Sequence, residues 1–529
     1  MRDVIVIGGG HNGLTAAAYL ARAGLRTLVL ERRPVLGGAC VTEELWPGFR
    51  VSRAAYVAGL LRPAVIRELG LRAHGLRLLE RNPSSYTPLP DGPGLLLGRD
   101  PAANAAEIRT FSARDAERYP AYQALLDRAA RALEPMLDVP PPDLPWPRLR
   151  DLRPLLRSAL GALRLGRELP RALALLLGPA RPALETWFES EPLRGTLATD
   201  AVIGAWASPS TPGTGYVLFH HVMGDTGGAR GVWAYVRGGM GALSEAIAAA
   251  ARAAGAEIRR DAPVARVVVE DGRARGVVLE DGSTLTARAV VSNADPRCTF
   301  EDLVGTEHLP TDFARELATL DFKSPSLKIN FALDRLPVFP GRSGSGHAPA
   351  AGPEHRGTIH LGAVDLDSID AAFETARAGR LPERPLVELT LPSSLDDSVA
   401  PPGKHVGSMF VQYAPYEIDG GWDGARDAFA DRVFALVDEV APGFSQSVLE
   451  REVLAPPDLE RIFGLTGGNI FHGAMSLDRL LFMRPLPGWA QYRTPISGLY
   501  LCGAGTHPGG GVMGACGRNA AGEILRDLG

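Results

Sequence analysis

The residues best suited to chemistry stand in the first forty positions, where three glycines and one acid are spaced as a nucleotide-binding turn requires. Gly8, Gly10 and Gly13 follow a short apolar segment and open an alanine-rich one, and Glu31 ends the next apolar segment. In a βαβ unit, the first glycine allows a tight turn, the second admits a pyrophosphate and the third lets the helix lie close to the sheet. The helix N-terminus offers amide hydrogens to phosphates, and the acid accepts hydrogen bonds from ribose hydroxyls. The sequence therefore predicts a bound dinucleotide.

A second glycine pair follows the acid directly. Glu31, Arg32 and Arg33 run into Gly37 and Gly38. This loop resembles the E-x-x-x-x-x-G-G continuation of flavoproteins, in which Arg32 or Arg33 approaches the phosphates and the glycines admit the cofactor backbone. The resemblance favours FAD over a nicotinamide cofactor.

A second dinucleotide fold is not predicted. Gly341, Gly344 and Gly346 are not followed by an apolar helix, so they predict a loop. The stretch GGMG at 238–241 opens a helix, and we expect that helix to start near the cofactor.

The chain closes on another apolar strand, a glycine-rich turn and a helix-like segment, in the stretch LYLCGAGTHPGGGVMGACGRNAA. In a flavoprotein, glycines here let the backbone approach the ribityl chain, the pyrophosphate and the ring face, where a side chain would collide. We expect a helix N-terminus near residues 511–513, whose amide groups would stabilise the negative charge of a reduced flavin. The residues predicted to contact the cofactor here are Gly503, Gly505, Gly511, Val512 and Met513.

The middle of the chain returns to the same sheet. Asp-Gly pairs at 271–272 and 281–282 separate valine-rich segments and predict a three-stranded meander. By resemblance to flavoproteins, Val264 begins a stretch that contacts adenine. The fold class predicted is α/β, with a discontinuous Rossmann-type FAD domain and a mixed-sheet plus helical substrate domain. The FAD domain is predicted at 1–75, 230–305 and 490–529, and the substrate or cap domain at 76–229 and 306–489.

Four stretches together carry a family resemblance: GGGHNGLTAAAYLARAG, GGMGALSEAIAAAA, VVSNADP and the glycine-rich closing stretch. They resemble the phytoene desaturase family of flavoproteins. The resemblance implies bound FAD, a second domain that covers the flavin and holds an apolar substrate, and redox chemistry at carbon–carbon bonds. Disulfide redox chemistry is not expected, because Leu45 rather than a cysteine follows Cys40 by five positions.

Two residues are candidates for the chemistry itself. Lys328 lies in a strand-like segment, in a position that resembles the strand lysine of flavin amine oxidases, which holds a water near flavin N5; oxygen activation or proton transfer would be its role. The alternative is a surface lysine on an edge strand. His507, on the closing turn, is predicted to contact the cofactor or donate a proton, and the alternative is a histidine that satisfies loop carbonyls. We expect His220 and His221 to line the core or the pocket.

Residues 148–181 contain eight arginines against two acids, with leucines at helical spacing. Such a basic amphipathic helix can lie on an anionic membrane. The alternative is a helical cap whose leucines pack on the substrate domain.

Composition excludes several classes of function. A net charge of −4 and a pI near 6.3 give no attraction to nucleic acid. Four widely separated cysteines predict neither a metal site nor disulfide staples. The chain shows no leader and no apolar run long enough to span a membrane, so the predicted location is cytoplasmic, with a peripheral contact on the inner face of the membrane. Basic residues are almost all arginine, which favours a GC-rich bacterial source.

The sequence therefore predicts an FAD-dependent oxidoreductase that desaturates an apolar small molecule and passes electrons to oxygen or a quinone. Three alternatives remain open at this point: a redox-neutral isomerase, a saturase that uses reduced flavin, and a flavin-bound scaffold protein.

Overall fold

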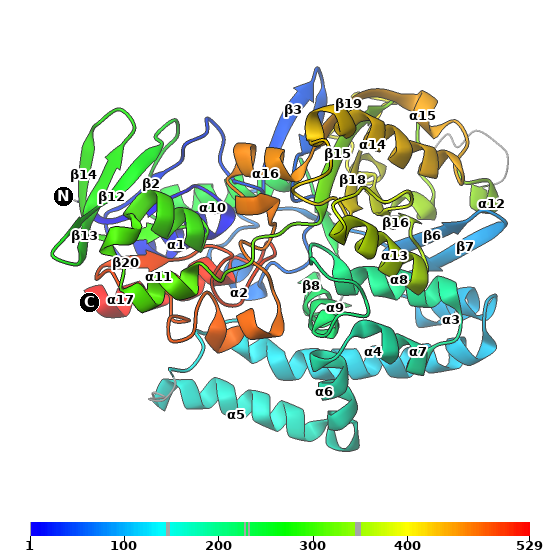
Figure 1. Cartoon of the computed structure of the whole chain (residues 1–529), viewed down its shortest axis with the longest axis horizontal. Helices are drawn as coiled ribbons and strands as arrows, with labels where there is room; N and C mark the ends of the chain where they lie inside the picture. The colour runs from blue at the N-terminus through cyan, green and yellow to red at the C-terminus, as the bar shows by residue number, and fades with distance from the viewer. Residues whose placement is uncertain (1, 144–148, 227–228, 231–232, 344–350) are drawn as a thin grey trace.

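The computed structural model describes residues 2–143, 149–226, 229–230, 233–343 and 351–529. Two large sheets occupy opposite sides of the molecule, and a group of helices lies beneath the second one (Figure 1). Both chain ends lie beside the first sheet.

The first sheet has seven strands in the order β11-β2-β1-β14-β13-β12, with β20 also paired to β14. Strand β1 is parallel to β2 and β14, and β14 is parallel to β20. The strands are β1 (Arg2–Ile7), β2 (Thr27–Leu30), β11 (Glu257–Arg259), β12 (Val264–Glu270), β13 (Arg273–Leu279), β14 (Thr284–Ser292) and β20 (Leu499–Leu501). Strands β12, β13 and β14 form the antiparallel meander that the two Asp-Gly pairs predicted.

Three helices pack together beside this sheet: α1 (His11–Arg22), α10 (Met240–Ala253) and α17 (Ala515–Leu528). Ala16, Ala17 and Ala18 on α1 are fully buried, and such small side chains let helices approach closely. Helix α10 begins at Met240, as the glycine stretch before it predicted. The parallel strands β2, β1, β14 and β20 with this layer of helices confirm the predicted Rossmann-type domain.

The second sheet has seven strands in the order β19-β15-β18-β17-β16-β6-β7. All neighbours are antiparallel except β16 and β6, so the sheet is mixed, as predicted. The strands are β6 (Ser85–Leu89), β7 (Gly92–Leu97), β15 (Ser326–Leu333), β16 (Thr358–Gly362), β17 (Leu386–Thr390), β18 (His405–Gln412) and β19 (Val448–Leu454). Every residue of β15 is buried, because strands flank it on both sides.

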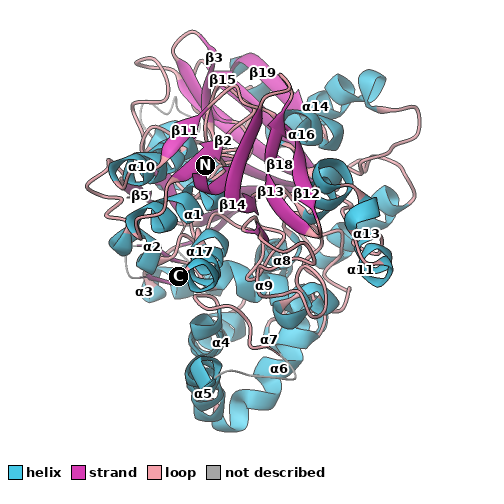
Figure 2. Ribbon diagram, turned by 90° about the vertical axis from the view of Figure 1, so that its left-hand side faces the viewer, coloured by secondary structure: helices cyan, strands magenta, loops and turns pink. Residues whose placement is uncertain are grey.

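Helices fill the remaining space, and those of the lower group are clear in Figure 2. The lower group consists of α3 (Pro101–Arg109), α4 (Ala113–Leu133), α5 (Leu149–Arg164), α6 (Leu169–Leu177), α7 (Ala180–Trp187), α8 (Glu191–Val202) and α9 (Thr214–Val222). The other helices are α2 (Pro63–Glu68), α11 (Thr311–Leu317), α12 (Pro340–Ser343), α13 (Leu366–Arg377), α14 (Trp422–Asp438), α15 (Phe444–Ser447) and α16 (Pro456–Phe463). Short strand pairs complete the fold: β3 (Thr42–Trp46) with β4 (Phe49–Ser52), β5 (Leu78–Glu80) with β10 (Ala234–Val236), and β8 (Asp225–Thr226) with β9 (Ala229–Arg230).

The first sheet takes its strands from the three ranges predicted for the FAD domain, and the second from the two ranges predicted for the substrate domain. The exact boundaries stay a prediction, since β5 lies in a predicted cap segment but pairs with β10 of a predicted FAD segment. Within the glycine loop predicted near residue 341, positions 344–350 lie outside the described residues. None of the helices in the described part of the chain combines the length and hydropathy that crossing a membrane requires.

Candidate functional site

The turn between β1 and α1 is shaped for close approach of backbone. Gly8 has a φ of +92°, and α1 begins at His11 without a side-chain cap. A Cβ atom at Gly13 would lie 2.3 Å from the carbonyl oxygen of Gly8, and one at Gly10 would lie 2.6 Å from Nδ2 of Asn293. The first amide groups of a helix have no partner within the helix and carry partial positive charge. The turn can therefore hold a phosphate.

Glu31 is buried, and its carboxylate ties the two glycine loops together. Its Oε2 accepts a hydrogen bond from the Gly9 N–H at 2.7 Å, and its Oε1 accepts one from the Arg33 N–H at 2.9 Å. A carboxylate has about four lone-pair sites, so Glu31 keeps capacity for ribose hydroxyls. Gly37 forms a parallel bridge with Gly10 and donates its N–H to the Gly9 carbonyl oxygen. The two glycine loops therefore lie side by side.

Arg32 and Arg33 reach toward the end of α16. The guanidinium of Arg33 donates to Oε2 of Glu43 at 2.7 Å and lies 5.3 Å from the ring centroid of Phe463. Arg32 donates to the carbonyl oxygen of Ile462 at 3.4 Å. Nη1 of Arg33 is buried and has no hydrogen-bond partner among the described residues. This arginine therefore keeps one donor for an anionic ligand.

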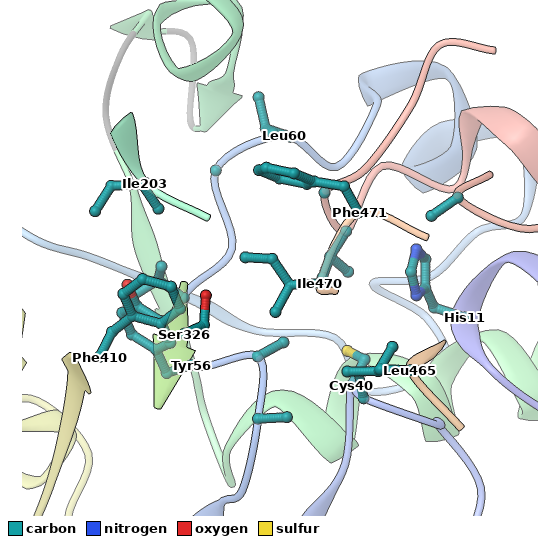
Figure 3. Close-up of a pocket in the computed structure, with 18 of the residues that line it drawn as sticks. His11, Cys40, Tyr56, Leu60, Ile203, Ser326, Phe410, Leu465, Ile470 and Phe471 are labelled. Carbon is teal, nitrogen blue, oxygen red and sulfur yellow. The ribbon is translucent and has the colours of Figure 1, made fainter. Parts of the chain in front are cut away.

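These loops form one end of a cavity of about 890 Å³ that reaches the second sheet (Figure 3). In Figure 3, His11 lies at the dinucleotide end and Tyr56 at the opposite end. The apolar side chains labelled between them are Leu60, Ile470 and Phe471. The predicted cofactor residues that line this cavity are Gly8, Gly10, Glu31, Arg32, Arg33, Gly37, Gly38, Val264, Gly511 and Val512.

The other predicted cofactor glycines stand behind the cavity wall. Gly13 provides close packing of α1 on the turn, as its predicted role requires. A Cβ atom at Gly503 would lie 2.7 Å from the carbonyl oxygen of Asn293, and one at Gly505 would lie 2.5 Å from Cδ of Pro296. These two glycines therefore allow the ends of β20 and β14 to approach each other.

The closing helix begins later than predicted. Helix α17 starts at Ala515 after Gly514, so residues 511–513 do not form its N-terminus. Gly511 has a φ of +112°, which continues the irregular turn instead of starting a helix. The Met513 side chain is buried against Leu60. The helix-dipole argument for these residues is therefore wrong, although Gly511 still lines the cavity.

The other end of the cavity, which we call the sheet end, carries a row of side chains across four strands. His360 on β16 pairs with Glu388 on β17, Glu388 with Phe410 on β18, and Phe410 with Lys328 on β15. Directly paired residues share one face of a sheet, and all four line the cavity. The Tyr56 hydroxyl donates to Oε2 of Glu388 at 2.6 Å, and Nζ of Lys328 lies 3.7 Å from the Tyr56 ring centroid.

Burial changes the protonation of this end of the cavity. It holds the pKa of Lys328 well below its usual value, raises the pKa of Glu388, and raises the pKa of Asp200 to about 6. It also lowers the pKa of His360 to about 3, so this imidazole is neutral at pH 7. Several shifted groups in one cleft are typical of a functional site. The lowered pKa favours the uncharged amine of Lys328, which is the form that accepts a proton.

The setting of Lys328 differs from the surface alternative. Strand β15 lies between β18 and β19, and Lys328 is 2% exposed, so the edge-strand alternative is wrong. Its lining of the cavity is compatible with the predicted role in oxygen activation or proton transfer, which stays a prediction.

The position of His507 does not support the role predicted for it. Its Nε2 lies 2.7 Å from the carbonyl oxygen of Met136, and its own carbonyl oxygen accepts from the Tyr492 hydroxyl at 2.6 Å. Among the described residues, His507 is not part of the cavity lining. The structure matches the alternative in which this histidine satisfies a loop carbonyl. His220 and His221 are buried and line the cavity, as expected.

Sequence reasoning missed most of the sheet end. The missed residues are Tyr56, Arg81, Asp200, His360 and Glu388. A signal existed for two of them, because His360 and Glu388 are ionisable residues inside the apolar segments TIHLG and LVELT. Two ionisable side chains inside buried strands need partners or a ligand.

The residues at the dinucleotide end fit FAD. The glycine loops leave room for a backbone–pyrophosphate contact, and the buried atoms Nε2 of His11 and Nη1 of Arg33 have no partner among the described residues. A Rossmann-type domain that shares one cavity with a second sheet is the arrangement expected of a flavin-dependent oxidoreductase. Comparison with known proteins agrees: a model of an NAD(P)-binding Rossmann-like domain matches residues 6–63, and a model described as flavin containing amine oxidoreductase matches residues 106–373. The chain belongs to the flavin containing amine oxidoreductase family, and its cofactor is FAD.

Relatives extend over the whole chain. The chain is 51% identical to pyridine nucleotide-disulfide oxidoreductase domain-containing protein 2 of Rattus norvegicus, over 99% of this chain and 94% of the relative. It is 30% identical to hydroxyneurosporene desaturase of Cereibacter sphaeroides, over 99% and 98% of the two chains. The solved cyclohexylamine oxidase from Brevibacterium oxydans has a TM-score of 0.57 at 19% identity, over 100% and 99% of the two chains, which shows a shared fold. Since relatives come from a mammal and from bacteria, the bacterial source stays a prediction, as does the cytoplasmic location.

The cysteines do not form the redox pair that disulfide chemistry requires. All four are free thiols, and Cys40 donates its S–H to the carbonyl oxygen of Met240 at 3.3 Å. Burial raises the pKa of Cys40 to about 12, so its thiolate is scarce at neutral pH.

Proposed function

We propose that the protein oxidises an apolar small molecule by desaturation and passes the electrons to oxygen or a quinone. One observation carries this proposal: a single cavity joins the FAD end to a buried sheet through an apolar middle. When bound, FAD would supply a two-electron acceptor for a hydride from the substrate. The similarity to a hydroxyneurosporene desaturase supports a carbon–carbon bond as the reacting group.

The chain's own residues supply binding, orientation and proton exchange. Leu60, Ile470 and Phe471 offer an apolar surface that excludes water around the substrate. Burial lowers the pKa of Lys328, and the neutral form of its amine can accept the proton that a desaturation releases.

Anaerobic absorbance spectroscopy of the FAD-loaded protein tests this proposal. Bleaching of the oxidised flavin on addition of a lipophilic extract, and recovery with oxygen or a quinone, supports an oxidising desaturase. Reoxidation of chemically reduced protein by the extract indicates a saturase. Product formation with no spectral change indicates an isomerase, and an unchanged spectrum with no product and a partner protein retained in a pull-down indicates a scaffold. A purified protein that takes up no FAD would refute all four of these functional hypotheses.

We also propose that α5 and α6 rest on an anionic lipid bilayer. Leu152, Leu156, Leu160 and Leu163 form a stripe on α5 and are 46–69% exposed. The α6 leucines exposed beside it are Leu173 and Leu177. Both views place these two helices at one extremity of the molecule (Figures 1 and 2). Within the predicted segment, residue 148 lies outside the described part of the chain.

Charge complementarity favours an anionic bilayer as the partner of these two helices. Arg153, Arg157 and Arg164 of α5 are exposed and follow the leucines at helical spacing, so cationic groups flank the apolar stripe. A helix of this kind inserts its leucines at the interface while its arginines contact anionic headgroups. The alternative of a helical cap leaves these leucines without the packing that it predicts, because they are exposed.

Co-sedimentation with vesicles tests the membrane proposal. We expect binding to vesicles that contain phosphatidylserine, weaker binding at high salt, and loss of binding in the double variant Leu156→Asp, Leu160→Asp. Leu449→Asp is the matched control, since Leu449 is 48% exposed on β19. Equal binding of the double variant and the control would contradict the proposal.

A further inference from the structure

The sheet end of the cavity holds hydrogen-bond donors that the protein itself does not use. Nζ of Lys328, Nε of Arg81 and the hydroxyl groups of Tyr122 and Ser326 are buried and have no hydrogen-bond partner among the described residues. All four residues line the cavity, and each is 1–2% exposed. An unpaired buried donor is costly to maintain, so four of them facing one cavity indicate that a ligand supplies the acceptor.

The other contacts of the Arg81 guanidinium hold its unpaired Nε–H in place. Its Nη2 donates to the carbonyl oxygen of Ser84 and to the hydroxyl of Thr358, and its guanidinium lies 5.1 Å from the Tyr235 ring centroid. The Tyr56 ring supports Lys328 in the same way. These contacts hold the two side chains in place and leave Nε–H of Arg81 and the N–H groups of Lys328 available to a ligand.

The neighbouring acids disfavour an anionic ligand. Glu388 raises the pKa of Lys328, and Asp200 raises the pKa values of both Glu388 and Tyr122, so the two carboxyl groups lie within electrostatic reach of the donors. The pKa of Asp200 is about 6, so this carboxyl group is largely ionised at pH 7 and a carboxylate ligand would meet like charge in a poorly solvated site. Nε of Arg81 can only donate, and neither an ammonium ligand nor a pure hydrocarbon offers it an acceptor, so neither of them satisfies this group.

We propose that the sheet end is a subsite for an uncharged carbonyl oxygen on an otherwise apolar substrate. This inference rests on the proposed function and narrows its substrate class. A carbonyl oxygen has two lone pairs and no hydrogen, so it can accept from two of the four donors at once. The apolar middle of the cavity then contacts the hydrocarbon part of the same molecule.

Equilibrium binding to the oxidised, FAD-loaded protein tests this subsite without turnover. The probes are limonene, its ketone carvone and the carboxylate perillate, which share one carbon skeleton and differ in oxygen chemistry. Isothermal titration gives the ratio of the limonene Kd to the carvone Kd for each variant. We expect Lys328→Met and Tyr122→Phe each to lower this ratio by about fivefold or more, because each removes one donor from the carbonyl.

The variants are chosen so that a change in binding does not arise from misfolding. Lys328→Met is close in size, and Tyr122→Phe removes only a hydroxyl group that has no partner among the described residues, so we expect both proteins to fold. The control is Lys323→Met, at an exposed lysine three residues before the start of β15 at Ser326, and it should leave the ratio unchanged. An unchanged ratio in both test variants, no carvone binding to the unmodified protein, or tighter binding of perillate than of carvone would overturn the subsite. A protein without FAD would instead defeat the proposed function, so the two failures are distinguishable.

Discussion

Replacement of Lys328 by methionine should change how stability depends on pH. In the unfolded chain the amine has a pKa near 10.5, and burial holds the folded pKa well below that value. Between the two pKa values, the unfolded state binds one more proton than the folded state. The free energy of unfolding of the unmodified protein therefore falls as pH falls, with a slope of about 1.4 kcal/mol per pH unit. Lys328→Met lacks this term, so its stability relative to the unmodified protein should increase from pH 10 downward.

Urea unfolding at pH 7, 8, 9 and 10, followed by tryptophan fluorescence with FAD present, measures this difference. We expect the difference in the free energy of unfolding to grow by about 1.4 kcal/mol per unit below pH 10 and to level off at the folded pKa of Lys328. The control Lys323→Met removes an exposed amine and should follow the unmodified protein. If Lys328→Met follows the unmodified protein just as closely at every pH, the amine is not held in its uncharged form and the reasoning fails.

Three further predictions follow from the described contacts. Gly13→Ala places a Cβ atom 2.3 Å from a backbone oxygen and should lower FAD occupancy by about tenfold. The control is Gly522→Ala, whose nearest contact is at 4.0 Å and which should keep the flavin-to-protein absorbance ratio of the unmodified protein. Equal absorbance ratios in the two variants would contradict the packing argument. Asp200→Asn removes a carboxyl group whose pKa is about 6 in the folded protein and 3.8 in the unfolded chain. Protonation of this group stabilises the unmodified protein at low pH, and that stabilisation is lost as pH rises through 6. The variant should therefore be more stable than the unmodified protein at pH 7, by up to about 3 kcal/mol in urea unfolding, with a smaller advantage at pH 5; an advantage that does not change with pH would count against it. Ellman's reagent should modify Cys40 only after denaturation, since its thiol is buried with a raised pKa, and rapid reaction in the native protein would show otherwise.

The dinucleotide end was predictable because its signals are local. The spacing of Gly8, Gly10 and Gly13 and the position of Glu31 follow from one turn and two short strands that are continuous in sequence. The start of α17 was not predictable, because alternating small and apolar residues before Ala515 suit a buried irregular turn as well as a helix. Local composition does not separate these two outcomes where tertiary packing decides.

The sheet end was not predictable, because its residues lie far apart in the sequence. These residues come from separate segments: Tyr56 from a loop, Asp200 from α8, and Lys328, His360 and Glu388 from strands. Only the register of four strands, together with the packing of that loop and helix, brings them together. Lys328 was noticed because lysine is rare in this chain, but its partners carried no such compositional mark. A close sequence-based search could have noted the acid in LVELT, yet it could not have paired that acid with a tyrosine 332 positions away.

The ionisable groups of the sheet end make physical sense as a set that exchanges one proton. Burial favours the neutral form of Lys328 and the neutral form of Glu388, so neither group has to carry an isolated charge in the cavity. Moving a proton from the acid to the amine creates two opposite charges that attract each other, which costs less than ionising either group alone. Tyr56 touches both, through its hydroxyl on Glu388 and its ring face beneath Lys328. The two groups then titrate as a coupled pair, so a pH profile of activity should report the pair and shift as a whole when either member is replaced.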